Sequence, residues 1–255
     1  MRNHRVLTLI VAIGWCAVVA ADAQATQFWV RFLSDAVDVV PGDGYGIAAD
    51  IGCTLRAAVQ EANALPGADT INVLPGTYRL QLQGTDDTAA AGDLDIADHV
   101  TIRCDGAEPC ILEAGASAST GIDRVFDIGT GSSPPSVRLE NLTVRHGKAS
   151  AGAGITVYNA QVTLAGVLVT GNWATGTSNV AGGGIYFSGS SGWLRLTDSQ
   201  VVENDLVIRD GQEGQGAGIR VYAGKPVEIT GSVIRDNGVG CSGRPEASWV
   251  EGSTG

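Results

Sequence analysis

The second half of the chain repeats itself, and this repeat constrains the fold more than any other feature. Four segments align: LENLTVRHG from residue 139, LAGVLVTGN from 164, LTDSQVVEN from 196 and ITGSVIRDN from 229. A second motif recurs between them, as GAGITV from 152, GGGIYF from 182 and GAGIRV from 216. The starts of the four segments are 25, 32 and 33 residues apart. Repeats of this length predict a solenoid, because one coil cannot bury its apolar face alone and stacked coils can.

Within each coil, alternation between apolar and polar residues assigns side chains to the inside or the outside. The predicted inward columns are Ile155, Ile185, Ile219 and Val157, Phe187, Val221. Three segments end in an asparagine, Asn172, Asn204 or Asn237, and we expect these amides to form a ladder. A parallel sheet needs cover on both faces, and a right-handed parallel β-helix meets this need by closing around its own core. We predict this all-β fold, with six to eight coils.

The rest of the chain divides into a cap, the solenoid and a tail. Residues 54–67, TLRAAVQEANALPG, predict the one helix: Leu55, Val59, Ala62 and Leu65 share one face, and Arg56, Gln60, Glu61 and Asn63 the other. Short strands follow from residue 69, separated by Gly, Asp and Pro. We therefore predict an N-terminal strand and helix cap over 26–68, the β-helix over 69–240 and a tail over 241–255.

The first 25 residues have the pattern of a secretory signal peptide. Arg2 and Arg5 precede an apolar run over 6–21, and Ala23-Gln24-Ala25 is an A-x-A cleavage site. The apolar run is short for a membrane span, which needs about 20 residues. We expect export, with no transmembrane segment after the signal peptide.

Export makes the cysteines candidates for disulfides. Cys104 and Cys110 flank the turn DGAEP and are close enough to bridge, whereas the partners of Cys53 and Cys241 stay open.

The net charge of −11 argues against nucleic acid as a partner, since such a surface repels phosphates.

Two groups of residues are candidates for ligand binding. Asp93 and Asp95, with Asp98 nearby, lie on one face of a predicted strand and offer oxygen ligands for calcium; the alternative is a solvated or turn-capping pair. We predict that Tyr158, Tyr186 and Tyr222 lie on one outer face with Arg220 beside them. This stripe could stack on sugar rings, or be ordinary tyrosine on a half-exposed sheet. No cofactor is required by the sequence, and calcium is the one that it suggests.

Other polar residues are weaker candidates for cation binding or catalysis. Glu203 and Asp236 precede the ladder asparagines of adjacent coils and could bridge a cation or point into water. His146 is assigned to a coil corner, where Gly171 stands in the next coil. A lyase would need aspartates that hold calcium and an arginine base, for which Arg209, Arg220 and Arg235 are available. A hydrolase would need clustered acids, and the nearby set is Glu203, Asp205, Asp210 and Asp236.

The segment CTLRAAVQEAN from residue 53 resembles the signature of the bacterial CSLREAI domain. Cys53, Leu55, Arg56 and either Ala57 or Ala58 match, Thr54 replaces the serine, and the glutamate of the motif is missing. The segments GADTINVLPGTYRL, AAGDLDI and DRVFDI and the GGGIY repeats are similar to the same family, over roughly residues 35 to 240.

The resemblance implies a right-handed β-helix, related to polymorphic outer-membrane and adhesin-like repeats, that is secreted or at the surface of a Gram-negative-type bacterium. It implies no established reaction. Pectate lyases share the fold, but fold does not give function. We therefore expect a non-enzymatic surface or extracellular module that binds glycan or protein, with a polysaccharide lyase or hydrolase as the alternative. The last coil lacks a cap in the sequence, so we expect further coils or a partner to cover it.

Overall fold

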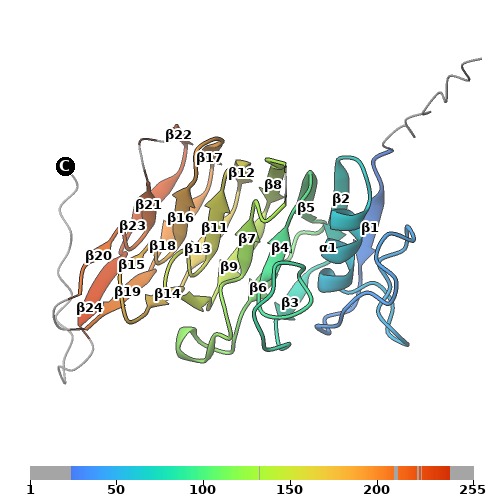
Figure 1. The fold of residues 1–255 in the computed structure, drawn as a ribbon, viewed down its shortest axis with the longest axis horizontal. Helices are drawn as coiled ribbons and strands as arrows, with labels where there is room; N and C mark the ends of the chain where they lie inside the picture. Colours follow the sequence, from blue (N-terminus) through green and yellow to red (C-terminus); the bar gives the residue numbers. More distant parts are fainter. Residues whose placement is uncertain (1–23, 132, 210–211, 223, 225, 242–255) are drawn as a thin grey trace, which may run out of the picture.

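The chain folds as a parallel β-solenoid, seen in a computed structural model that describes residues 24–131, 133–209, 212–222, 224 and 226–241. The predicted signal peptide, except for its last two residues, and residues 242–255 of the predicted tail lie outside this range. The coils follow one another along the long axis in sequence order, as the colours in Figure 1 show. The predicted β-solenoid is thus confirmed.

Five parallel sheets form the walls of the solenoid, and we number them 1 to 5. Sheet 1 contains β1 (Gln27–Val30), β2 (Asp69–Val73), β5 (Val100–Cys104), β8 (Ser136–Glu140), β12 (Gln161–Ala165), β17 (Trp193–Thr197) and β22 (Val227–Thr230). Sheet 2 contains β3 (Gly76–Arg79), β6 (Cys110–Glu113), β9 (Leu142–Arg145), β13 (Leu168–Thr170), β18 (Gln200–Val202) and β23 (Val233–Arg235). Sheet 3 contains β4 (Leu94–Ile96), β7 (Phe126–Ile128), β11 (Ile155–Tyr158), β16 (Ile185–Ser188) and β21 (Ile219–Val221).

Two smaller sheets complete the later coils. Sheet 4 contains β10 (Lys148–Ala149), β14 (Trp173–Thr175), β19 (Asp205–Ile208) and β24 (Gly238–Cys241), and sheet 5 contains β15 (Val180–Ala181) and β20 (Gly214–Gln215). One full coil therefore runs through sheets 1, 2, 4, 5 and 3 before it returns to sheet 1. Among the described residues, sheet 1 has seven strands and the other sheets have fewer, because β1 precedes the first complete turn. The solenoid has about five turns, fewer than the six to eight that we expected.

The register between coils places like residues on like. Ile155 pairs with Ile185, and Ile185 with Ile219, while Phe187 lies between Val157 and Val221. Ile155 and Ile185 are fully buried. Each buried aliphatic side chain contributes about 1.5–3 kcal/mol, so these inward columns are the main stabilising feature. Both predicted columns are confirmed.

The asparagine ladder also forms as predicted. The Asn172 side-chain amide donates to Asn204 Oδ1 at 2.9 Å, and that of Asn204 donates to Asn237 Oδ1 at 3.0 Å. The amide of Asn204 also donates to the carbonyl oxygens of Val169 and Val202. Because Asn172 and Asn204 are buried, the ladder satisfies polar groups that water does not reach.

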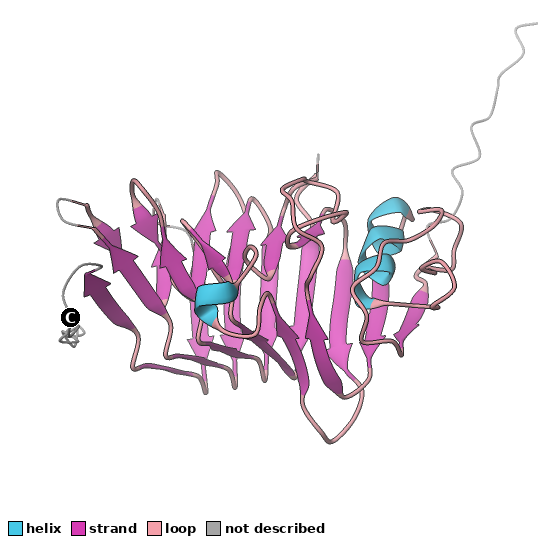
Figure 2. Cartoon of the chain, turned by 90° about the horizontal axis from the view of Figure 1, so that it is seen from below, coloured by secondary structure: helices cyan, strands magenta, loops and turns pink. Residues whose placement is uncertain are grey.

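The helix α1 (Leu55–Ala64) lies against the N-terminal end of the stack, as Figure 2 shows. Thr54 caps it by accepting from the Ala57 backbone N–H at 3.2 Å. The polar face of the helix does not face water, because Arg56, Gln60 and Glu61 are buried. They are buried because loops before and after the helix fold over this face and supply hydrogen-bond partners. A second, 3-10 helix, η1 (Ala118–Thr120), was not predicted.

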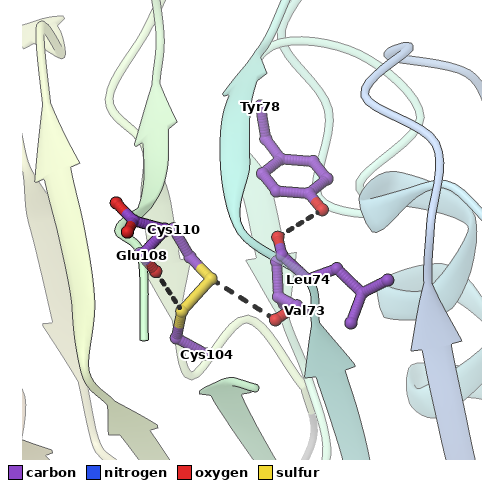
Figure 3. Close-up of a disulfide and its surroundings, with 6 residues drawn as sticks. All are labelled: Val73, Leu74, Tyr78, Cys104, Glu108 and Cys110. Atoms are coloured by element: carbon purple, nitrogen blue, oxygen red, sulfur yellow. Dashed lines mark hydrogen bonds between the residues drawn. A yellow bond between two sulfur atoms is a disulfide. The ribbon is translucent and has the colours of Figure 1, made fainter. Parts of the chain in front are cut away.

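The predicted disulfide joins Cys104 to Cys110, with their Cα atoms 5.6 Å apart, and its surroundings appear in Figure 3. It links the end of β5 to the start of β6, at the corner between sheets 1 and 2. The Cys110 sulfur lies 3.3 Å from the Val73 carbonyl oxygen of the preceding coil. Nearby, the Tyr78 hydroxyl donates to the Leu74 carbonyl oxygen at 2.7 Å. The bridge therefore fixes a corner that packs on the coil before it.

In the last described coil, apolar side chains are exposed at positions that are buried in the coils before it. Ile229 and Ile234 are 46% and 41% exposed, whereas their partners Leu196 and Val201 are fully buried. Nothing among the described residues covers these side chains. Within the same part of the chain, we find no helix with the length and apolar character needed to cross a membrane.

Candidate functional site

One column of outward-facing residues on sheet 3 contains most of the side chains that could bind a ligand. Asp95 pairs with Asp127 in the next coil, and Asp127 with Thr156. Thr156 then pairs with Tyr186, and Tyr186 with Arg220. Because neighbouring strands are about 4.8 Å apart, this column has an acidic end and an aromatic and basic end, roughly 10 Å or more from each other.

The acidic end gathers three carboxylates, which we call the acidic cluster. Asp93 and Asp95 flank the first residue of β4, and Asp127 lies in β7. One carboxylate oxygen from each lies within 4.8 Å of the others. Asp93 and Asp95 are buried and Asp127 is half-buried. Such a set can hold a hard cation or retain protons.

Burial is the main influence on the acidity of this cluster. It raises the pKa of Asp93 to about 8, helped by the negative charges of Asp123 and Asp95. The pKa of Asp95 rises to about 7, again mainly through burial, although a hydrogen bond from the Ala89 backbone opposes the rise. Burial also raises the pKa of Asp127. The cluster therefore favours protons or a bound positive charge over free carboxylates.

Arg124 is the positive group beside the cluster. Its side chain forms an ion pair with Asp127, and its Nε lies 3.6 Å from Asp93 Oδ2. The second distance is too long for a hydrogen bond, and Arg124 Nε has no hydrogen-bond partner among the described residues.

Arg56 of α1 holds the loop before β4 in place. Its guanidinium donates to the carbonyl oxygens of Ala89, Gly92 and Asp93 at 2.8–3.0 Å. On its other side it forms an ion pair with Asp35 at 2.6 Å. The side chains of the acidic cluster are thus supported by the cap.

The sequence identified two of the three members of the cluster. Asp93 and Asp95 do lie together, but the third carboxylate is Asp127 and not Asp98, whose charge instead acts on Asp69. The missed signal is the match between LDI at 94–96 and FDI at 126–128, which stack in register.

The other end of the column opens into a small hollow, which we call the tyrosine hollow. It has a volume of about 250 Å³, and Tyr186, Arg220 and Tyr222 line it together with Asn179 and Gln215. Further lining comes from Ala151, Val180, Ala181 and Glu213. The Arg220 guanidinium carbon lies 6.0 Å from the centre of the Tyr222 ring. Aromatic faces and hydrogen-bonding side chains therefore face the same space.

The hollow forms where the chain bends from sheet 5 into sheet 3. Gly182 and Gly216 occupy this bend in successive coils, with φ angles of 59° and 67°. Glycine adopts this left-handed conformation without steric cost, so the repeated glycine runs set the position of the hollow.

Tyr158 lies on the outside of sheet 3, as Tyr186 does, but in a different column. It pairs with Ser188, because it stands two residues further along its strand than Thr156, the partner of Tyr186. It is 51% exposed and lines a different hollow, with Pro134, Asn159 and Ser190 among its neighbours.

Glu113 forms a charged group that the sequence did not indicate. Its carboxylate is buried on the outside of sheet 2, between Arg79 and Arg145 of the neighbouring coils, which donate to it at 2.7 and 2.8 Å. These two arginines lower its pKa against the effect of burial. His146 Nδ1 lies 3.5 Å from the same carboxylate and 3.0 Å from the Gly115 carbonyl oxygen.

Of the remaining candidates, Glu203, Arg209 and Asp236 are exposed, and His146 and Asp205 are half-buried. His146, Gly171, Glu203 and Asp236 occupy one corner position, each with φ between 53° and 60°, as we expected for His146. Asp236 forms an ion pair with Arg235 at the surface. Asp210 lies outside the described residues.

Cys53 and Cys241 are the two cysteines whose disulfide partners the sequence left open. Cys53 is a free cysteine, and burial, together with the negative charge of Asp38, raises its pKa to about 11. A thiol in this state is a weak nucleophile. The side chain of Cys241 lies outside the description.

Together these features define a parallel β-solenoid that presents an acidic cluster and a tyrosine hollow on the outside of one sheet. Comparison with protein-family models, curated proteins and solved structures found no match. The resemblance to the CSLREAI domain and the export of the chain stay predictions.

Proposed function

We propose that this chain is an exported, non-enzymatic binding module that recognises carbohydrate at the tyrosine hollow. One observation carries the proposal: Tyr186 from one coil and Arg220 and Tyr222 from the next line one hollow. The apolar face of a sugar ring stacks on an aromatic ring, and its hydroxyl groups need donors and acceptors at the edge. Asn179 and Gln215 supply such groups in the same hollow.

The chemistry of the hollow also suggests a class of sugar. Arg220 is a fixed positive charge with several donors, which suits the carboxylate of an acidic sugar. Glu213 lines the same hollow and is an acceptor for sugar hydroxyls. We therefore favour a glycan that contains uronic or other acidic sugars, bound one or two rings at a time.

A lyase has less support than a binding module. Such a site would need calcium-binding aspartates next to the arginine base. Arg220 in β21 is three strands from Asp127 in β7, which is roughly 14 Å at the usual strand spacing. The acidic cluster and Arg220 are therefore not arranged around one substrate carboxylate.

A binding experiment with matched variants tests the proposal. The exported chain would be screened against acidic and neutral oligosaccharides, and affinities measured by calorimetry for Tyr186→Ala, Tyr222→Ala and the control Tyr158→Ala. We expect each of the first two variants to weaken binding of an acidic glycan about tenfold or more, which corresponds to about 1.4 kcal/mol. Tyr158→Ala should bind as the wild type does.

Three results would contradict the proposal. One is the absence of binding to any glycan, and another is equal loss in Tyr158→Ala and Tyr222→Ala. The third is the release of unsaturated or reducing ends from polygalacturonate, which would favour the lyase or hydrolase instead if Arg220→Ala abolished it.

A further inference from the structure

We propose that the acidic cluster of Asp93, Asp95 and Asp127 is a binding site for a divalent cation of the calcium type. The inference is independent of the carbohydrate proposal, because it rests on other residues of the column. Calcium is bound by carboxylate oxygens at 2.3–2.6 Å, so two oxygens on one ion are at most about 5 Å apart. The oxygens of the three carboxylates lie within 4.8 Å of one another, which fits this limit.

The carboxylate of Asp93 is an independent indication of a missing ligand. Its side chain is 6% exposed, and no described residue donates a hydrogen bond to it. The nearest donor, Arg124 Nε, is 3.6 Å away and is itself without a hydrogen-bond partner. A buried polar group without a hydrogen bond is costly, whereas a cation between the carboxylates would satisfy it.

The charges around the cluster favour a cation. Asp93, Asp95 and Asp127 contribute three negative charges when ionised, and Asp123 acts on Asp93 and Asp127 as a further negative charge. In the described part of the chain, Arg124 is the one positive charge that acts on both Asp93 and Asp127, so the group stays net negative and a divalent ion would reduce the repulsion. Because the Arg124 side chain is 23% exposed, it has a path toward solvent when the ion enters.

The surrounding structure fixes the ligands before an ion arrives. The Ala89 backbone N–H donates to Asp95 Oδ2 at 2.9 Å, and Arg56 holds the carbonyl oxygen of Asp93 at 3.0 Å. Asp127 comes from the next coil and is in register with Asp95. A bound ion would therefore connect two coils and the loop that joins them to the cap. It would stabilise the folded chain only, because the unfolded chain does not assemble the cluster.

Thermal unfolding of the chelator-treated chain, with calcium chloride as the probe, tests the site. We expect a saturable rise in Tm of several degrees, and calorimetric binding of about one calcium per chain. Asp93→Asn and Asp127→Asn should lose both effects, while the exposed control Asp105→Asn should keep them. Circular dichroism would establish that each variant has the β-rich spectrum of the wild type.

Arg124→Gln distinguishes a cation site from a purely internal ion-pair group. If Arg124 competes with the ion, its removal should tighten calcium binding about tenfold or more. If the cluster serves only to pair Arg124, this variant should be less stable and gain nothing from calcium. Magnesium should bind more weakly, because it requires a stricter octahedral geometry.

The proposal would be overturned if millimolar calcium left the Tm of the wild type unchanged. It would also be overturned if Asp93→Asn and Asp127→Asn responded to calcium as Asp105→Asn does. Since Asp127 is the less buried ligand, Asp127→Asn provides the test even if Asp93→Asn fails to fold.

Discussion

At the scale of single residues, buried charges depend on partners from neighbouring coils. Glu113 is buried and accepts from Arg79 in the coil before and Arg145 in the coil after. The two arginines are 46% and 32% exposed, so part of each attraction is screened by water. Their combined effect still lowers the pKa of Glu113.

The lowered pKa of Glu113 predicts loss of stability in acid. Because the carboxylate is more acidic in the folded chain, its stabilisation is complete above its unfolded pKa of about 4.3 and is lost as the pH falls through the folded value. We expect the free energy of unfolding of Glu113→Gln to be lower than that of the wild type by roughly 1–2 kcal/mol at pH 7. The difference should shrink below pH 4.

Urea unfolding from pH 3 to 8 measures this difference. Glu108→Gln, at an exposed position in the turn closed by the disulfide, is the control and should match the wild type throughout. A constant difference between Glu113→Gln and the wild type down to pH 3 would contradict the account of this carboxylate.

The residue scale is also where sequence analysis was least successful. Arg56 and Glu61 occupy the polar face of an amphipathic helix, which usually faces water, yet both are buried. Arg56 is satisfied by carbonyl oxygens about 35 residues away, and no local pattern encodes such contacts. Asp93 and Asp95 were found because they are close in sequence, whereas Asp127 required the register between coils.

At the scale of elements, the asparagine ladder connects corners of successive coils. Asn204 lies in the middle: its side chain accepts from Asn172 and donates to Asn237. Asn204→Ala would remove the Oδ1 that accepts from the backbone N–H and side-chain amide of Asn172, and the amide that donates to the Val169 and Val202 carbonyl oxygens. We expect it to lower the free energy of unfolding by about 3 kcal/mol in a chemical denaturation experiment.

Asn237→Ala is the matched comparison for the ladder. Asn237 is at the last described coil and is less buried, so water can replace more of its contacts. We expect at most half the loss seen in Asn204→Ala. Equal losses would indicate that burial does not set the strength of the ladder.

The disulfide is a second connecting element. Cys104 and Cys110 close a loop of about seven residues, for which the chain-entropy model gives about 2.4 kcal/mol. We expect the double variant Cys104→Ser, Cys110→Ser to be less stable by about this amount and to keep its β-rich spectrum. A variant with unchanged stability under oxidising conditions would contradict this role.

At the scale of the whole molecule, the repeat defines a unit that can be removed. Gln161 pairs with Trp193 in the next coil, so residues 161–192 make up one coil. Deleting 161–192 should leave a folded, shorter and less stable solenoid, because each coil contacts mainly its neighbours. Deleting 161–184, which is not a whole coil, should abolish the fold. Circular dichroism and gel filtration would distinguish the two products.

The overall fold was predictable because a solenoid repeats its local pattern. The inward alternation of Ile155, Ile185 and Ile219 and the asparagines at corners indicated both the coils and their register. The number of turns was overestimated, at six to eight where the solenoid has about five. The alternation placed Tyr158 and Tyr186 on the same outer face, but it did not show that they lie in different columns, two residues apart in register.

The register between coils is the claim on which both proposed sites depend, and paired cysteines test it most directly. Ala165 pairs with Thr197 on the outside of sheet 1. Neighbouring Cα atoms about 5 Å apart allow a disulfide, whereas positions offset by two residues are about 8 Å apart and do not. Oxidation followed by peptide mapping should find a new bridge in Ala165→Cys, Thr197→Cys and none in Ala165→Cys, Arg195→Cys. The reverse result would contradict the stacked register.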